Sequence, residues 1–334
     1  MADLTTTYLG LKLRNPIIAG SSGLTSNIES IKNLERNGIG AVVLKSIFEE
    51  QIILDADNQL RLAKKNQFIY TERSESLDYI DYHVKIDYVS KFLNLISQVK
   101  EKTLLPVIGS INCITSGEWI NFAKKIEEAG ADAIELNISV LNANPNKSAV
   151  DVEKLHIELI RKIKATVNIP VAVKLSPYFC NLAQLSGKLQ EEGVSGMVLF
   201  NRYFSPDIDI DTMEISTGSI YSSPTEFTNS LRWISILSGK TSIDLVGATG
   251  IHDGKTAIKL LLAGAKGVQV VSTTYKNGFE VIPKMLSEIE FWMEQNRYNY
   301  IDQFAGSMNQ YKSKDASSYE RIQFMRYYSG IGTK

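Results

Sequence analysis

Two lysines, each placed at the end of an apolar run, are the residues of this chain best suited to chemistry. Lys45 follows residues 41–44 (Ala-Val-Val-Leu), and Lys174 follows residues 169–173 (Ile-Pro-Val-Ala-Val). Such runs are typical of buried parallel strands, and in α/β barrels the carboxyl ends of the strands carry the functional side chains. Two ammonium groups held there would stabilise negative charge on a bound ligand.

Two asparagines occupy comparable places. Asn137 ends the run 133–137, and Asn201 follows the run 196–200. A single asparagine after a strand is more often a turn former than a ligand. Together with the two lysines, however, these amides supply donors, acceptors and cations, a combination that suits a planar heterocycle with carbonyls and ring nitrogens. The pattern predicts a binding site for such a ring.

Small residues follow the last two strand candidates. Residues 246–251 read Val-Gly-Ala-Thr-Gly-Ile and precede a helix candidate that begins at Gly254, and residues 270–274 read Val-Val-Ser-Thr-Thr. Small residues let backbone N–H groups approach a phosphate, and barrels bind phosphate at these two loops. Tight turns that need glycine for steric reasons alone are the alternative. We expect phosphate binding here.

Eight apolar runs alternate with eight amphipathic stretches of helical period. The alternation favours an α/β fold, a (β/α)8 TIM barrel. A doubly wound open sheet is the structural alternative, although no GxGxxG follows the first strand, as the dinucleotide-binding version requires. The predicted strands are residues 16–19, 41–45, 106–111, 133–137, 170–175, 196–200, 242–247 and 267–271. The predicted helices are residues 27–37, 87–100, 117–129, 151–167, 182–192, 224–238, 254–263 and 278–295.

Two connections are long, residues 46–86 and residues 201–223, and both follow strand ends. In a barrel they would lie as loops over the carboxyl-terminal face and enclose ligands. We predict one barrel domain over residues 1–310 and a C-terminal extension over residues 311–334.

Composition narrows the class of protein. The chain of 334 residues has a formal net charge of −1, 44% hydrophobic and 22% charged residues, so no basic surface for nucleic acid is expected. No apolar run approaches the length of a membrane span, and the amino terminus lacks a signal-peptide pattern. Its two cysteines, Cys113 and Cys180, are far apart, which argues against a disulfide framework or a zinc site and favours the cytoplasm. The alternating aspartates of residues 207–211 suggest a solvated strand or loop face, so no metal is expected.

The chain resembles the dihydroorotate dehydrogenase family, whose members are FMN-dependent (β/α)8 barrels. The likeness covers most of the chain and is closest to the soluble, cytosolic branch, because no membrane-associating helix precedes the barrel. It rests on the order and spacing of residues 15–19, 21–23, 45–46, 135–139, 173–179, Asn201, 247–251, 261–265 and 268–270.

The resemblance implies roles for individual residues, an FMN cofactor, a small-molecule substrate and a homodimer. Physically, a lysine near flavin N1 stabilises the anionic reduced ring and favours hydride acceptance. Ala19, Ser21 and Gly23 would pass beside the flavin, Lys45 and Ser46 would lie near the ring and substrate, and Lys174 would face the N1/C2 edge. Asn137 would contact flavin and substrate, and Asn142 and Asn201 would contact substrate. The ribityl phosphate would be held by Ser219, Thr249, Gly250, Val271 and Ser272.

Two departures from the family pattern concern the substrate. The family's general base, a cysteine or serine, follows the serine of an Asn-x-Ser motif, and here that position is Val140, which cannot take a proton. Residues 73–79 replace an Asn-containing, Gly-Leu substrate motif. Replacement bases are weakly supported, because Cys113 and Cys180 read as buried inert thiols and His83 as a solvated loop residue.

Three functions therefore remain open. The first is a flavin-dependent dehydrogenase acting on a CH–CH bond, either of dihydroorotate in pyrimidine biosynthesis or of a related small ring compound. The second is a barrel lyase or aldolase that uses Lys174 as a Schiff-base nucleophile. The third is an FMN-binding homologue that lacks dihydroorotate activity because of Val140. The electron acceptor is also open.

Overall fold

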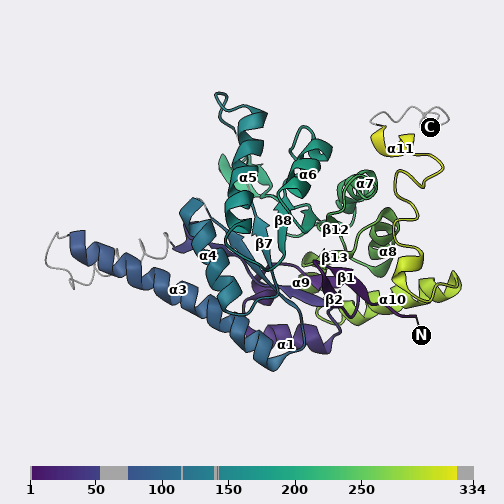
Figure 1. The fold of residues 1–334 in the computed structure, drawn as a ribbon, viewed down its shortest axis with the longest axis horizontal. Helices are drawn as coiled ribbons and strands as arrows, with labels where there is room; N and C mark the ends of the chain where they lie inside the picture. The colour runs from purple at the N-terminus through teal and green to yellow at the C-terminus, as the bar shows by residue number, and fades with distance from the viewer. Residues whose placement is uncertain (1, 53–73, 114–115, 139–140, 142, 322–334) are drawn as a thin grey trace.

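All eight predicted strands form one closed parallel barrel in the computed structural model, which describes residues 2–52, 74–113, 116–138, 141 and 143–321 (Figure 1). The strand order around the barrel is β4-β3-β13-β12-β9-β8-β7-β6, and β4 pairs with β6 to close it. This closure confirms the (β/α)8 prediction and excludes the open sheet. The strands are β3 Ile17–Ala19, β4 Ala41–Val43, β6 Val107–Asn112, β7 Ala133–Asn137, β8 Val171–Leu175, β9 Gly196–Leu199, β12 Asp244–Gly247 and β13 Gly267–Val270.

Within the described part of the chain, eight longer helices surround the barrel and correspond to the eight predicted ones (Figure 1). Polar caps start several of them; for example, the Asp253 side chain accepts a hydrogen bond from Thr256 N, and Gly264 ends the same helix with φ +116°. The helices are α1 Ile28–Arg36, α3 Ser74–Lys102, α4 Ser116–Glu128, α5 Ala149–Lys164, α6 Leu182–Glu191, α7 Phe227–Leu237, α8 Gly254–Ala263 and α10 Val281–Gln295.

Alternation along the strands creates two apolar cores. One face of each strand packs against the surrounding helices, and the other fills the inside of the barrel. An antiparallel hairpin, β1 Thr6–Tyr8 and β2 Leu11–Leu13, closes the amino-terminal end of the barrel with Tyr8 and Leu9. A Cβ at Gly196 would come within 2.5 Å of Leu9 and 3.0 Å of the Tyr8 ring, so only glycine leaves room for this plug. Ligands therefore enter at the carboxyl ends of the strands.

Both predicted long loops contain regular structure, which corrects the sequence-based expectation. The backbone of α3 begins at Ser74, so residues 74–86, and His83 among them, belong to a helix that projects from the barrel (Figure 1). Residues 74–86 contain no Gly or Pro that would end a helix, and this is why the helix continues through them. Residues 201–223 carry a hairpin, β10 Pro206–Asp209 and β11 Glu214–Thr217.

The residues of β10 are all exposed, which confirms the interpretation of its aspartates as a solvated strand face. Short elements that were not predicted are β5 Ile47–Phe48, which pairs with β6, and the helices α9 Ser272–Asn277 and α11 Ser317–Glu320. Among the described residues, no helix is long and apolar enough to cross a membrane.

The chain after α10 packs against the outer side of α7 and α8. Met308 N donates to the carbonyl of Leu262, Gln310 N donates to the carbonyl of Ser235, and the ring of Tyr311 covers Gly239. The predicted boundary at residue 310, between the barrel domain and a C-terminal extension, stays a prediction.

Candidate active site

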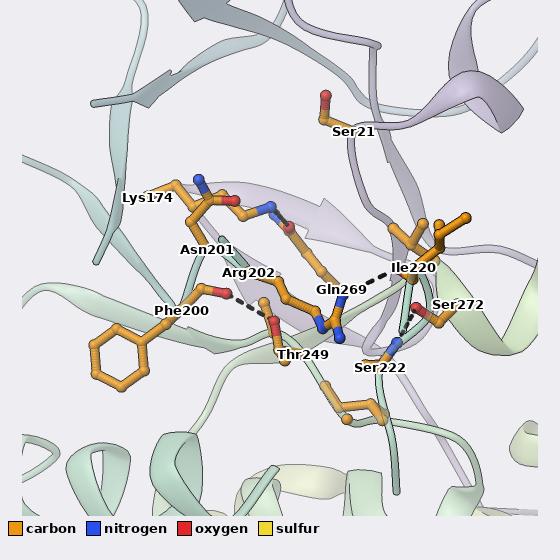
Figure 2. Close-up of a pocket in the computed structure, with 14 residues that line it drawn as sticks. Ser21, Lys174, Phe200, Asn201, Arg202, Ile220, Ser222, Thr249, Gln269 and Ser272 are labelled. Atoms are coloured by element: carbon orange, nitrogen blue, oxygen red, sulfur yellow. Dashed lines mark hydrogen bonds between the residues drawn. The ribbon is translucent and has the colours of Figure 1, made fainter. Parts of the chain in front are cut away.

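A cavity of about 220 Å³ opens at the carboxyl ends of the barrel strands (Figure 2). Seven of the sequence-predicted residues line it: Ser21, Lys174, Asn201, Thr249, Gly250, Val271 and Ser272. The structure adds seven that were not predicted: Phe200, Arg202, Ile220, Ser222, Ala248, Ile251 and Gln269. The strand-end lysine and the two small-residue loops therefore share one cavity.

Lys174 lies on the floor of this cavity within a buried polar network. Its Nζ donates to Gln269 Oε1 at 2.9 Å, and Gln269 Nε2 donates to Glu135 Oε2 at 2.5 Å (Figure 2 shows the first contact). Lys174 Nζ also lies 3.7 Å from Glu135 Oε1. The Lys174 side chain is 11% exposed and that of Glu135 1%, so the ion pair is removed from solvent. We call Lys174, Gln269 and Glu135 the floor network.

Asn137 lies beside Lys174 on the neighbouring strand. The two residues are partners in the register of β7 and β8, and Asn137 is buried. Glu135 precedes Asn137 by two positions and therefore points to the same face of β7. The alternation along this strand could have revealed Glu135 from sequence. Ala133, Glu135 and Asn137 share one face, and the larger apolar residues Ile134 and Leu136 share the other.

The small-residue loops form the opposite end of the cavity. Thr249 and Gly250 have positive φ angles of +70° and +79°, and Thr249 Oγ1 donates to the Phe200 carbonyl at 3.0 Å (Figure 2). A Cβ at Gly250 would lie 2.3 Å from the backbone nitrogen of Phe227, so the loop needs glycine at this point. The close packing of this turn holds its backbone in a fixed position beside Ser272.

Ser222, rather than the predicted Ser219, reaches the cavity from the long connection of residues 201–223. Ser222 N donates to Ser272 Oγ at 3.0 Å (Figure 2). Ser222 Oγ lies 3.1 Å from His252 Nε2. Burial, followed by the positive charge of Lys276, lowers the pKa of His252. Ser219 turns its hydroxyl to the Tyr221 carbonyl and does not line the cavity.

Arg202, directly after Asn201, lines the cavity and forms hydrogen bonds that hold its wall together. Its Nε donates to Glu226 Oε2 at 3.0 Å. Its Nη atoms donate to the carbonyls of Ile220 and Ser219 at 3.0 and 2.8 Å, and Figure 2 shows the contact with Ile220. The guanidinium thus ties the returning chain after the β10–β11 hairpin to the end of β9. Nothing in the sequence distinguished this arginine from a surface one.

The remaining predicted cofactor residues lie beside the cavity without lining it. Ser21 Oγ is 3.1 Å from Ser46 Oγ and accepts from Ser46 N, and Ser46 Oγ lies 2.7 Å from Ser110 Oγ inside the barrel. Lys45 N donates to the Thr25 carbonyl. Ala19 ends β3, and Gly23 opens a 3₁₀ turn, Gly23–Thr25, against the Tyr275 hydroxyl.

The structure changes the interpretation of several residues considered for acid–base chemistry. Val140 and Asn142 lie outside the described residues. Cys180 is exposed and Cys113 half-buried, so the expectation that both are buried thiols is wrong, because neither residue lies inside a strand or helix. His156 is buried on α5, where its Nδ1 lies 2.8 Å from the Val152 carbonyl.

The fold and the cavity define a class: a (β/α)8 barrel with a polar cavity over a buried lysine, at the end of the barrel opposite the plug. A family model described as dihydroorotate dehydrogenase matches residues 83–293, more than half of the chain. The chain belongs to the dihydroorotate dehydrogenase family, as the sequence motifs indicated. Members of this family are flavin-dependent oxidoreductases that act on a CH–CH bond.

Curated relatives agree over nearly their whole length. A protein of Thermoplasma volcanium is 27% identical over 317 residues, which cover 92% of this chain and 98% of the relative. Proteins of Thermoplasma acidophilum and Pyrococcus abyssi are 26% and 25% identical, over 92% and 91% of this chain. Each of the three is named dihydroorotate dehydrogenase B (NAD(+)), catalytic subunit.

Proposed function

We propose that this protein is an FMN-dependent oxidoreductase that oxidises dihydroorotate, or a related small ring compound, in pyrimidine biosynthesis. The observation that carries the proposal is the floor of the cavity, where the Lys174 ammonium, beside Asn137 on the neighbouring strand, meets a cavity whose far end is lined by small-residue loops. This donor set fits FMN, because an ammonium suits the N1/C2 edge of the ring and a backbone turn of small residues suits a phosphate.

In this proposal each wall of the cavity has its own task. FMN, when bound, supplies the hydride acceptor. Lys174 would hold the N1/C2 edge, and Gly250, Val271 and Ser272 would hold the phosphate. Asn137 and Asn201 would orient the substrate, with Asn142 as a third amide. Lys45 and Ser46, beyond the Ser21 hydroxyl, would border the ring, while Ala19 and Gly23 line its approach.

The lyase alternative is less well supported. A Schiff-base lysine must present a neutral amine, and such lysines are activated by desolvation or by a second cation. Among the described residues, Lys174 has neither a second cation nor an isolated apolar pocket among its contacts: it lies 3.7 Å from the Glu135 carboxylate and donates to Gln269. The amine is therefore placed to bind an anionic edge rather than to attack a carbonyl.

Val140 supports a second version of the proposal, in which the protein binds FMN but does not oxidise dihydroorotate. Abstraction of a ring proton without a general base loses roughly 10²–10⁴-fold in rate. Anaerobic mixing of the FMN-bound protein with dihydroorotate separates the two versions. Bleaching of the flavin absorbance supports dihydroorotate oxidation. A spectrum that stays unchanged while dithionite still bleaches it refutes that substrate and leaves the FMN-binding homologue.

Retention of FMN is the first test of the whole proposal. The purified protein is expected to be yellow and to release one FMN per chain on denaturation. The Lys174→Met variant is expected to bind FMN more weakly, and Lys240→Met, on the outer surface, is the matched control. A wild-type protein that fails to retain FMN supplied in excess contradicts the proposal.

A partner subunit is part of the same proposal. The relatives are named as catalytic subunits of NAD(+) enzymes, and those names imply a second subunit in their assemblies. We propose that this chain, too, is a catalytic subunit, that it forms a homodimer in the cytoplasm, and that it passes electrons to a separate protein. Light scattering of the purified chain tests the homodimer, which a monomer mass would contradict.

A further inference from the structure

The floor network contains a carboxylate that the proposed function does not use. Glu135 lies inside the barrel on β7, its side chain is 1% exposed, and its Oε1 has no hydrogen-bond partner among the described residues. Gln269 reaches it from β13, on the opposite side of the barrel. A buried carboxylate is costly unless it is paired, so its presence beneath the cavity calls for a physical reason.

The geometry gives Glu135 influence over Lys174 without occupying all of the ammonium donors. The carboxylate attracts the ammonium across 3.7 Å, a distance beyond a hydrogen bond. The direct hydrogen bond of Lys174 within the network goes to Gln269 Oε1, and Gln269 in turn donates to Glu135. An ammonium has three donors, so those that remain can point into the cavity.

We propose that Glu135 is the counter-ion of Lys174 and that Gln269 is a positioning residue between them. Glu135 offsets part of the charge of the Lys174 ammonium, and Gln269 aims the ammonium at the ligand. This inference rests on the proposed function, in which the ligand is FMN. Glu135 lowers the reduction potential of the bound flavin below the potential that the flavin would have beside a lysine without a counter-ion.

Other titratable or charged groups approach the same region from neighbouring elements. The Tyr8 phenol in the plug has its pKa raised by burial and then by the charges of Glu135 and Asp244, so it stays neutral. The Arg202 guanidinium lines the cavity and is paired with Glu226. Lys45 follows β4 at the same end of the barrel. None of the charges named here replaces Glu135 directly beneath the Lys174 ammonium.

The first experiment compares midpoint potentials of bound FMN at pH 6 in wild type and Glu135→Gln. A unit charge that acts over roughly 10 Å of protein changes an equilibrium by about tenfold or more. Glu135→Gln is therefore expected to raise the potential by at least about 30 mV, the shift that corresponds to tenfold for a two-electron couple. An unchanged or lower potential overturns the proposal.

The exchange variant Glu135→Gln/Gln269→Glu distinguishes an electrostatic role of Glu135 from a structural one. It returns a carboxylate to the position that already accepts from Lys174 at 2.9 Å, so it is expected to restore the wild-type potential. A merely structural role for Glu135 predicts no such recovery. Glu153→Gln is the matched control: this buried carboxylate pairs with Lys188 between α5 and α6, outside the barrel, and its removal should leave the potential unchanged.

Failure of the inference and failure of the proposed function give different results. If the wild type does not retain FMN, the proposed function fails, and the flavin-free proteins decide the inference by their resistance to urea. Glu135→Gln should then be less stable than wild type, and the exchange variant should recover most of the loss. Equal stabilities of all three proteins overturn the role of Glu135.

Discussion

Removal of the Lys174 ammonium should destabilise the flavin-free protein, and the floor network sets the size of the effect. In Lys174→Met, Glu135 stays buried and keeps the hydrogen bond from Gln269 Nε2, but no longer faces a cation. Two unit charges 3.7 Å apart at an effective dielectric constant of about 20 attract each other by about 4 kcal/mol. This agrees with the roughly 3–5 kcal/mol lost when one member of a buried pair is removed. We expect Lys174→Met to lower the free energy of unfolding by about 3 kcal/mol.

The double variant Lys174→Met/Glu135→Gln provides the contrast. Replacement of both charges removes the unpaired carboxylate, so the double variant should lose about 1 kcal/mol or less relative to wild type. Equilibrium urea unfolding of the flavin-free proteins, followed by circular dichroism, measures the free energy of unfolding of wild type, the two single variants and the double variant. All four curves are fitted with one shared dependence of the free energy on urea concentration. Single losses that simply add in the double variant would refute the reasoning, because they would show that the two charges do not interact.

Three further predictions concern the turn, the missing base and pH. Gly250→Ala should cost about 2 kcal/mol or more of stability and weaken FMN binding, whereas Gly187→Ala, in open space on α6, should stabilise by about 0.5–1 kcal/mol; urea unfolding and FMN titration check both. Val140→Cys should raise the rate of flavin reduction by dihydroorotate by about 10²-fold or more in stopped-flow mixing, and no gain would contradict the base assignment. Burial lowers the pKa of His156, so the unfolded chain binds its proton more readily and stability should fall as pH drops through about 6.5; His156→Gln should flatten that fall in urea midpoints measured from pH 7.5 to 5.5.

The barrel was predictable because its signal repeats. Each strand is an apolar run followed by a helical stretch, and eight repeats leave few architectures that bury them all. The β1–β2 hairpin has three-residue strands and mixed polarity, so its pattern is too short to stand out. The early start of α3 was missed because its first turns are rich in polar residues, which resemble a loop when no tertiary contact is known.

The cavity was predictable in Lys174 and in its small-residue loops, but not in the groups that contact Lys174. Lys174 and Gly250 lie at strand ends, where local sequence already indicates function. Gln269 lies within β13 and touches Glu135 from the opposite side of the barrel, and this contact depends on closure and register together. Arg202 gains its role only when the hairpin returns the carbonyls of Ser219 and Ile220 to it. Long-range contacts of this kind leave no local pattern.

The two ends of the barrel interior explain why the charge pair can act on a ligand. Below the pair, Tyr8 and Leu9 seal the barrel together with alanines such as Ala133 and Ala172, and these residues keep water out. Above it, the Lys174 ammonium meets the cavity. In a poorly polarisable interior the attraction between Lys174 and Glu135 is strong, so the pair stays fixed while a ligand binds. An anionic ring edge bound above therefore experiences an oriented ion pair, positive end first, rather than a mobile cation.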